Sequence, residues 1–150
     1  MKNSIVLFFL AVFAISSQVF AHSDEYLDSI ATPHGGQMRM AGMYHFELVV
    51  KENELNVYIT DHADQPIASQ NASGQATILA AGQRSQISLQ TAGGNKLKGK
   101  GTFAMDEQMR VVLNIGFHSQ QAEQARFTPL APRSVEQTGH ENNHADHSHH

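Results

Sequence analysis

The sequence has no cysteine and comparatively few basic residues. Without cysteine, neither a disulfide framework nor thiolate chemistry is available. Lys and Arg number 10 against 14 Asp and Glu, which gives a formal net charge of −4 at pH 7. Nucleic-acid phosphates would repel this balance, and the chain contains no basic stripe. We therefore expect no nucleic-acid partner.

Long apolar runs are also scarce, and the main one stands at the N-terminus. It extends over 11 residues from Ile5 to Ile15, follows Lys2, and precedes Val19-Phe20-Ala21, a small-x-small pattern that suits a signal peptidase. Roughly 20 apolar residues are needed to span a bilayer. We predict a cleaved signal peptide over residues 1–21 and no membrane insertion after cleavage. A retained anchor is the alternative, but Ser16-Ser17-Gln18 interrupts the run.

After residue 43 the apolar side chains recur at every second position, which is typical of half-buried β-strands. Strands are expected at residues 44–51, 55–59, 76–80, 86–90, 96–103, 109–117 and 123–128, with no convincing helix. This pattern predicts an all-β fold, a small antiparallel β-sandwich or barrel of about seven strands over residues 32–130. Residues 22–31 form an N-terminal segment, and the polar, His-rich tail at 131–150 is expected to be disordered.

The first two strands are predicted to form a hairpin around the polar turn at residues 52–54. If Val50 pairs with Leu55, then His45 falls opposite Thr60, and His62 lies one diagonal step away at about 7–8 Å. Glu47 shares that face, which is opposite to the apolar one.

Histidine is over-represented, and all ten histidines follow residue 21. His34 stands on a glycine-flanked loop that can reach the same end of the hairpin, whereas Asp61 points to the other face unless the strand has already ended. Imidazole and carboxylate ligands suit zinc or copper(II), and thioethers favour copper(I). We therefore predict a copper or zinc site; its candidate residues are His34, His45, Glu47, His62 and Asp61, with Met38, Met40 and Met43 as thioether candidates. The alternative is that these histidines are ordinary strand residues and that Met38 and Met40 belong to the core.

Two further metal-binding features lie at the ends of the mature chain. Cleavage after Ala21 would make His22 the first residue, whose α-amine and imidazole together can chelate copper. The alternative is that His22 is simply an unordered first residue. The tail is a compositional metal-binding tract with modest selectivity, formed by His140, His144, His147, His149 and His150. No Ser-His-Asp order, HExxH motif or nucleotide-binding loop is present, so we predict that the protein is not an enzyme. Oxidative chemistry at a His22 copper site is the minor alternative.

Three short motifs carry a resemblance: Pro33-His34-Gly35-Gly36, Tyr44-His45-Phe46-Glu47 and Thr60-Asp61-His62. They resemble the small periplasmic heavy-metal-associated domains of Gram-negative bacteria, found alone or attached to metal-efflux adaptor proteins. The resemblance extends over most of residues 33–128. It implies a periplasmic β-domain that handles copper, zinc or a related ion, and it says nothing about His22 or the tail.

The expected function is thus periplasmic metal binding, in which the protein buffers or delivers copper or zinc in heavy-metal resistance or efflux. A metal-efflux adaptor or a metallochaperone is the expected protein partner. The alternative is a non-catalytic module that docks on an efflux adaptor or another envelope partner, with histidines serving as polar contacts or pH sensors.

Overall fold

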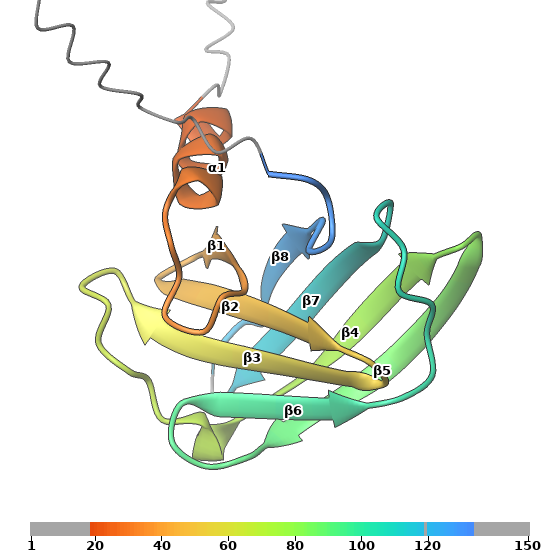
Figure 1. Ribbon diagram of the computed structural model, residues 1–150. Coiled ribbons are helices and arrows are strands. Elements are labelled where there is room, and N and C mark those ends of the chain that lie inside the picture. Colours follow the sequence, from red (N-terminus) through yellow and green to blue (C-terminus); the bar gives the residue numbers. More distant parts are fainter. Residues whose placement is uncertain (1–18, 119, 134–150) are drawn as a thin grey trace, which may run out of the picture.

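An antiparallel sheet of eight strands dominates the computed structural model, which describes residues 19–118 and 120–133 (Figure 1). The strands are β1 (Gln37–Ala41), β2 (Tyr44–Lys51), β3 (Glu54–Asp61), β4 (Ala72–Ala80), β5 (Gln83–Thr91), β6 (Lys96–Lys100), β7 (Arg110–Phe117) and β8 (Glu123–Phe127). Their order in the sheet is β1-β2-β3-β6-β5-β4-β7-β8. The sheet curls until β1 lies beside β8, which produces a nearly closed barrel. The predicted all-β class is confirmed.

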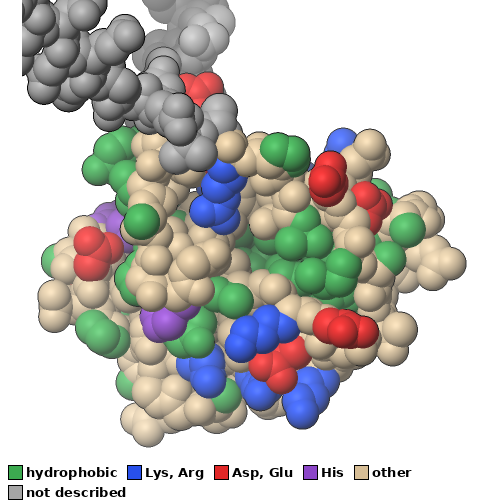
Figure 2. All heavy atoms as spheres, in the orientation of Figure 1, with side chains coloured by type: hydrophobic (Ala, Val, Ile, Leu, Met, Phe, Trp, Pro, Cys, Tyr) green, Lys and Arg blue, Asp and Glu red, His purple; other side chains and the backbone are tan. Residues whose placement is uncertain are grey.

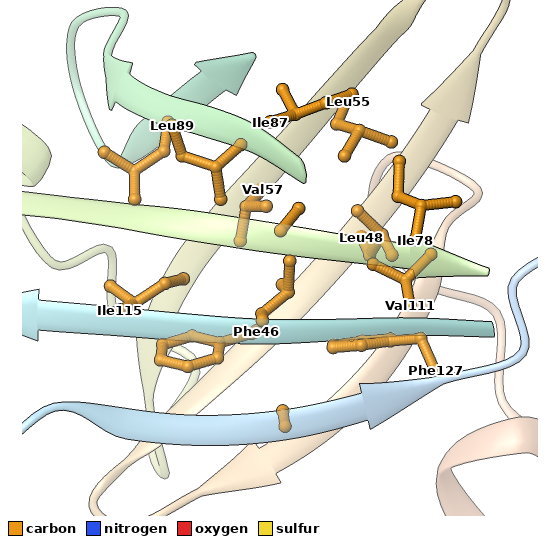
Figure 3. Packing of buried hydrophobic residues seen from close by; sticks show 14 of the residues in the cluster. Phe46, Leu48, Leu55, Val57, Ile78, Ile87, Leu89, Val111, Ile115 and Phe127 are labelled. Atoms are coloured by element: carbon orange, nitrogen blue, oxygen red, sulfur yellow. The ribbon is translucent and has the colours of Figure 1, made fainter. Parts of the chain in front are cut away.

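The apolar residues of alternating strand positions fill the inside of this barrel (Figure 3). Phe46 and Leu48 of β2 are buried beside Leu55 and Val57 of β3, all at 1% exposure or less. The hairpin register was predicted correctly, because Val50 pairs with Leu55 and His45 pairs with Thr60. This register directs the intervening polar side chains of β2 and β3 to the outer surface of the barrel.

Two elements depart from the sequence-based expectation. The helix α1 (Val19–Ser29) precedes the barrel, where no helix was predicted, and β1 adds an eighth strand. Among residues 24–29 of the helix, Leu27 is the only buried apolar side chain. The apolar periodicity of the α1 sequence is therefore too weak to predict a helix. The signal-peptide prediction falls largely on residues 1–18 and the tail prediction on 134–150, which lie outside the described residues.

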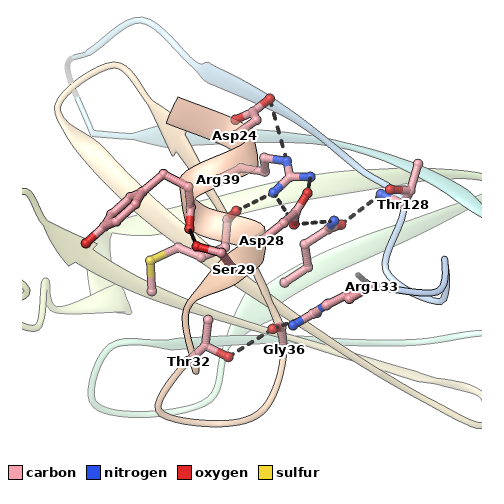
Figure 4. A network of polar contacts seen from close by, with 11 residues as sticks. Asp24, Asp28, Ser29, Thr32, Gly36, Arg39, Thr128 and Arg133 are labelled. Atoms are coloured by element: carbon pink, nitrogen blue, oxygen red, sulfur yellow. Dashed lines mark hydrogen bonds and ion pairs between the residues drawn. The ribbon is translucent and has the colours of Figure 1, made fainter. Parts of the chain in front are cut away.

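Polar contacts, rather than apolar packing alone, fasten α1 over the seam between β1 and β8 (Figure 4). The Arg39 guanidinium donates to both Asp28 carboxylate oxygens at 2.8 and 2.9 Å. Gln37 donates to Asp28 at 2.9 Å and accepts a hydrogen bond from the Thr128 N–H at 2.8 Å. Burial raises the pKa of the Asp28 carboxyl, but the hydrogen bonds from Arg39 and Gln37 outweigh it, so this pKa lies below its ordinary value.

Strand β6 ends at Lys100, three residues before the predicted end. A Cβ atom at Gly99 would lie 2.6 Å from the Ile87 side chain and 2.8 Å from the Ser88 carbonyl oxygen. Glycine therefore permits the close approach of β6 to β5. Within the described ranges, no helix is long and apolar enough to cross a membrane.

Candidate metal site

The outer surface of β1, β2 and β3 gathers most of the predicted site residues. Strand pairing places Met38 opposite Glu47 and Met40 opposite His45 on one side of β2. On the other side, Tyr58 lies opposite Glu47. Directly opposed residues of antiparallel strands point to the same side of a sheet. Histidine side chains are visible at two separate places on the molecular face in Figure 2.

The first histidine pair joins His34, in the segment before β1, to Glu47 of β2. The His34 backbone N–H and the Gly36 N–H both donate to Glu47 Oε1, at 2.8 and 3.0 Å. The His34 ring nitrogen Nδ1 lies 2.7 Å from Glu47 Oε2. A Cβ atom at Gly36 would approach the Leu48 carbonyl oxygen to 2.5 Å, so glycine is required for this segment to lie so close to β2. Both oxygens of the Glu47 carboxylate are thus engaged in holding the segment.

These contacts decide the protonation of the pair. Burial raises the pKa of the Glu47 carboxyl, but the hydrogen bonds from the His34 ring, the Gly36 N–H and the His34 N–H outweigh it and hold the pKa below its ordinary value. The ionised carboxylate only accepts hydrogen bonds, so His34 Nδ1 carries the proton and donates it. His34 Nε2 is then left with a lone pair for a ligand or a proton. Carboxylates often fix the tautomer of metal-binding histidines in this way.

A pocket of about 230 Å³ adjoins this pair. The His34 ring stacks on Tyr58 with centroids 3.5 Å apart and planes inclined by 2°. Met38 and Glu47 line the pocket beside the two rings, and Asp64 lies on its wall. The stack and the Glu47 hydrogen bonds together fix the orientation of the His34 ring.

The second histidine pair consists of His45 on β2 and His62, directly after β3. Their ring centroids are 5.0 Å apart, with planes inclined by 28°. The His45 side chain is 14% exposed, and its Nδ1 atom is buried without a hydrogen-bond partner. Thr60 Oγ1, directly across from His45 on β3, is likewise buried and unpartnered. Among the described residues, these are the two buried side-chain polar atoms that lack a partner.

The loop after β3 brings a carboxylate to this second pair. Asp64 Oδ1 lies 3.5 Å from His45 Nδ1, which is too long for a hydrogen bond but close enough for electrostatic attraction to a cationic ring or a shared ion. Asp61 has a different role, because its Oδ1 accepts the N–H groups of Ala63 and Gln65 at 2.8 and 2.9 Å. Asp61 therefore shapes the turn that carries Asp64. Asp64 was not among the site residues predicted from the sequence.

The structure thus divides the predicted site into two pairs, with His34 beside Glu47 and His45 beside His62. Within residues 19–118 and 120–133, no three His, Asp or Glu side chains converge as a ready metal cage. Of the methionines, Met38 is 7% exposed, Met40 38% and Met43 77%. The side chain of His22 and the five tail histidines lie outside the part that the structure describes.

Comparisons with known protein families, curated proteins and solved structures find no match for this chain. Function is therefore inferred from the two histidine pairs and their surroundings.

Proposed function

We propose that the protein binds a copper or zinc ion at the His45–His62 pair and buffers or delivers that ion outside the cytoplasm. The observation that carries this proposal is the pair of unpartnered buried atoms, His45 Nδ1 and Thr60 Oγ1, beside a second imidazole. Native structures pair nearly all buried polar atoms, so an exception of this kind points to a functional role such as binding an ion.

The spacing of the two rings supports this assignment. Two imidazoles that bind one ion through bonds of about 2.0–2.1 Å at a tetrahedral angle have ring centroids about 5 Å apart. The His45 and His62 centroids are 5.0 Å apart, a separation at which rotation of the two rings can direct a nitrogen of each toward one ion. Asp64 on the adjoining loop is 79% exposed and can complete the coordination together with solvent.

A site with two imidazoles and one exposed carboxylate suits exchange more than permanent retention. Closed four-ligand sites are typical of structural zinc, whereas open positions admit incoming ligands. A partner protein can occupy such a position and take over the ion. The resemblance to periplasmic heavy-metal-associated domains supports the same reading, because His45 and His62 both fall within its motifs.

The test is metal titration of the full chain in which the five tail histidines are replaced by serine, which removes the competing tract and keeps the chain length. Zinc(II) and copper(II) are titrated separately by calorimetry. We expect about one ordered ion per chain, and weakening by at least about tenfold in His45→Ala and in His62→Ala, the lower limit for loss of a supporting group at a metal site.

His118→Ala is the matched control, because His118 is an exposed strand-end histidine whose Nδ1 contacts the Asn71 carbonyl oxygen at 3.3 Å. It should bind both ions as the parent does. Equal affinities in His45→Ala, His62→Ala and the parent would contradict the proposal and leave the barrel as a docking module.

A further inference from the structure

The thioether of Met40 belongs to the immediate surroundings of His45. Met40 on β1 and His45 on β2 are directly opposed in the strand register, so their side chains share the outer surface. Such cross-strand neighbours have Cβ atoms about 4.5–5.5 Å apart. His45 is therefore flanked by Met40 on one side, by Thr60 on the other, and by the His62 ring along the strand.

Packing does not account for Met40. Met109 is 0% exposed and belongs to the core cluster, as expected for a methionine that fills a core, whereas Met40 is 38% exposed. Because more than a third of the Met40 side chain stays in contact with solvent, its burial stabilises the fold only in part. The partly exposed Met40 side chain thus lies next to His45 across the two strands, and His45 has a ring nitrogen without a hydrogen-bond partner.

We propose that the His45–His62 site binds copper(I), with Met40 Sδ as its third ligand. This inference rests on the proposed function and specifies its metal. Thioethers are soft donors that select copper(I), while they contribute little to zinc. Two imidazoles and one thioether form a three-coordinate set, so the site holds copper(I) without needing the Asp64 carboxylate. The ion is bound already reduced, and no electron transfer is involved.

The selectivity follows from which ligands each ion uses. Zinc(II) and copper(II) favour imidazole and carboxylate, so they would engage His45 and His62 together with Asp64. Copper(I) would engage the same two imidazoles together with Met40. Loss of the thioether should therefore weaken copper(I) binding selectively and leave zinc binding in place.

The experiment is an anaerobic competition for copper(I) between a chromophoric copper(I) chelator and the full chain carrying serine in place of the tail histidines. Met40→Leu should weaken copper(I) binding by at least about tenfold, the lower end of the effect of losing even a supporting group at a metal site. Zinc(II) affinity of the same variant should stay within about twofold. X-ray absorption at the copper edge should show a sulfur neighbour in the parent and none in Met40→Leu.

Met105→Leu is the matched control, because Met105 is an exposed methionine, 49% accessible, on the segment between β6 and β7. It should leave copper(I) affinity unchanged. Unaltered copper(I) binding in Met40→Leu, or a loss produced by Met43→Leu instead, would overturn the assignment of Met40. If His45→Ala still weakens zinc(II) in that case, the proposed function stands without this inference. If His45→Ala weakens neither ion, both fail together.

Discussion

The two histidine pairs lie on the same three strands but differ in how their polar atoms are satisfied. In the His34–Glu47 pair, three donors meet two carboxylate oxygens at 2.7 to 3.0 Å. In the His45–His62 pair, the ring centroids are 5.0 Å apart, yet His45 Nδ1 and the neighbouring Thr60 Oγ1 have no hydrogen-bond partner. The first pair satisfies the Glu47 carboxylate within the fold, whereas the second leaves two buried polar atoms without a hydrogen bond.

This difference separates a structural contact from a candidate binding site. The hydrogen bonds of Glu47 with His34 and Gly36 are called the fastening below, because they hold one segment of the chain against another. A buried polar group with all its partners stabilises a local structure, and here it pins residues 34–36 against β2. A buried polar group without partners lowers stability, and a bound ion or water would satisfy it. Glu47, one of the predicted ligands, holds the His34 ring through Oε2.

The largest expected effect comes from removing the fastening. Glu47→Ala leaves the N–H groups of His34 and Gly36 without their acceptor, and each buried unsatisfied group costs about 1–3 kcal/mol. We expect the free energy of unfolding of the metal-free protein to fall by about 2–4 kcal/mol, measured by urea denaturation. Glu52→Ala, at an exposed turn position, should change it by less than about 0.5 kcal/mol. Similar losses in the two variants would contradict the fastening role.

Acid should weaken the same fastening. The pKa of Glu47 is lower in the folded protein than in the unfolded chain. At an acidic pH the folded protein therefore binds fewer protons than the unfolded chain does. The stabilisation is fully present above the ordinary glutamate pKa of about 4.3 and is lost as the pH falls through the folded value. The free energy of unfolding of the metal-free protein should therefore decrease from pH 6 to pH 3. Both Asp28 and Glu47 contribute to this decrease, because the pKa of each carboxyl is lowered in the fold.

Glu47→Gln isolates the contribution of Glu47 to this pH dependence. The amide does not titrate, so the variant should lose less stability than the parent below about pH 4.3. Asp28 contributes equally to both proteins and cancels in the difference. Parallel pH profiles for the two proteins would show that Glu47 is not depressed in the fold.

The sequence was sufficient for the hairpin that carries both pairs. Polar and apolar residues alternate along β2 and β3, and this alternation determines which side chains face outward. The predicted pairing of His45 with Thr60 is observed. The helix α1 was missed because polar contacts through Asp28 hold it more than an apolar stripe does. Such contacts join residues far apart in the chain, and no local period records them.

The division of the site into two pairs was also beyond the sequence. His34 was expected near the end of the hairpin, but Glu47 and Tyr58 hold its ring two residues further along β2. Asp64 was not among the predicted site residues, and its approach to His45 depends on the turn that Asp61 stabilises. The hydrogen bonds that Asp61 accepts in this turn are local, but the distance from Asp64 to His45 depends on how the turn packs against β2.

The smallest effect provides the sharpest contrast, because one substitution can be made in both pairs. In His34→Phe the stack on Tyr58 can persist, but Glu47 Oε2 loses its donor, so stability should fall by about 1–2 kcal/mol. In His45→Phe an unpartnered buried nitrogen is replaced by carbon, so the free energy of unfolding should stay unchanged or rise by up to about 1 kcal/mol. Urea denaturation of both metal-free variants measures the difference, and zinc titration should show that His45→Phe has lost the ion. Equal destabilisation by the two substitutions would mean that the His45 ring is as firmly satisfied as the His34 ring, and the contrast between a fastening and an open site would not hold.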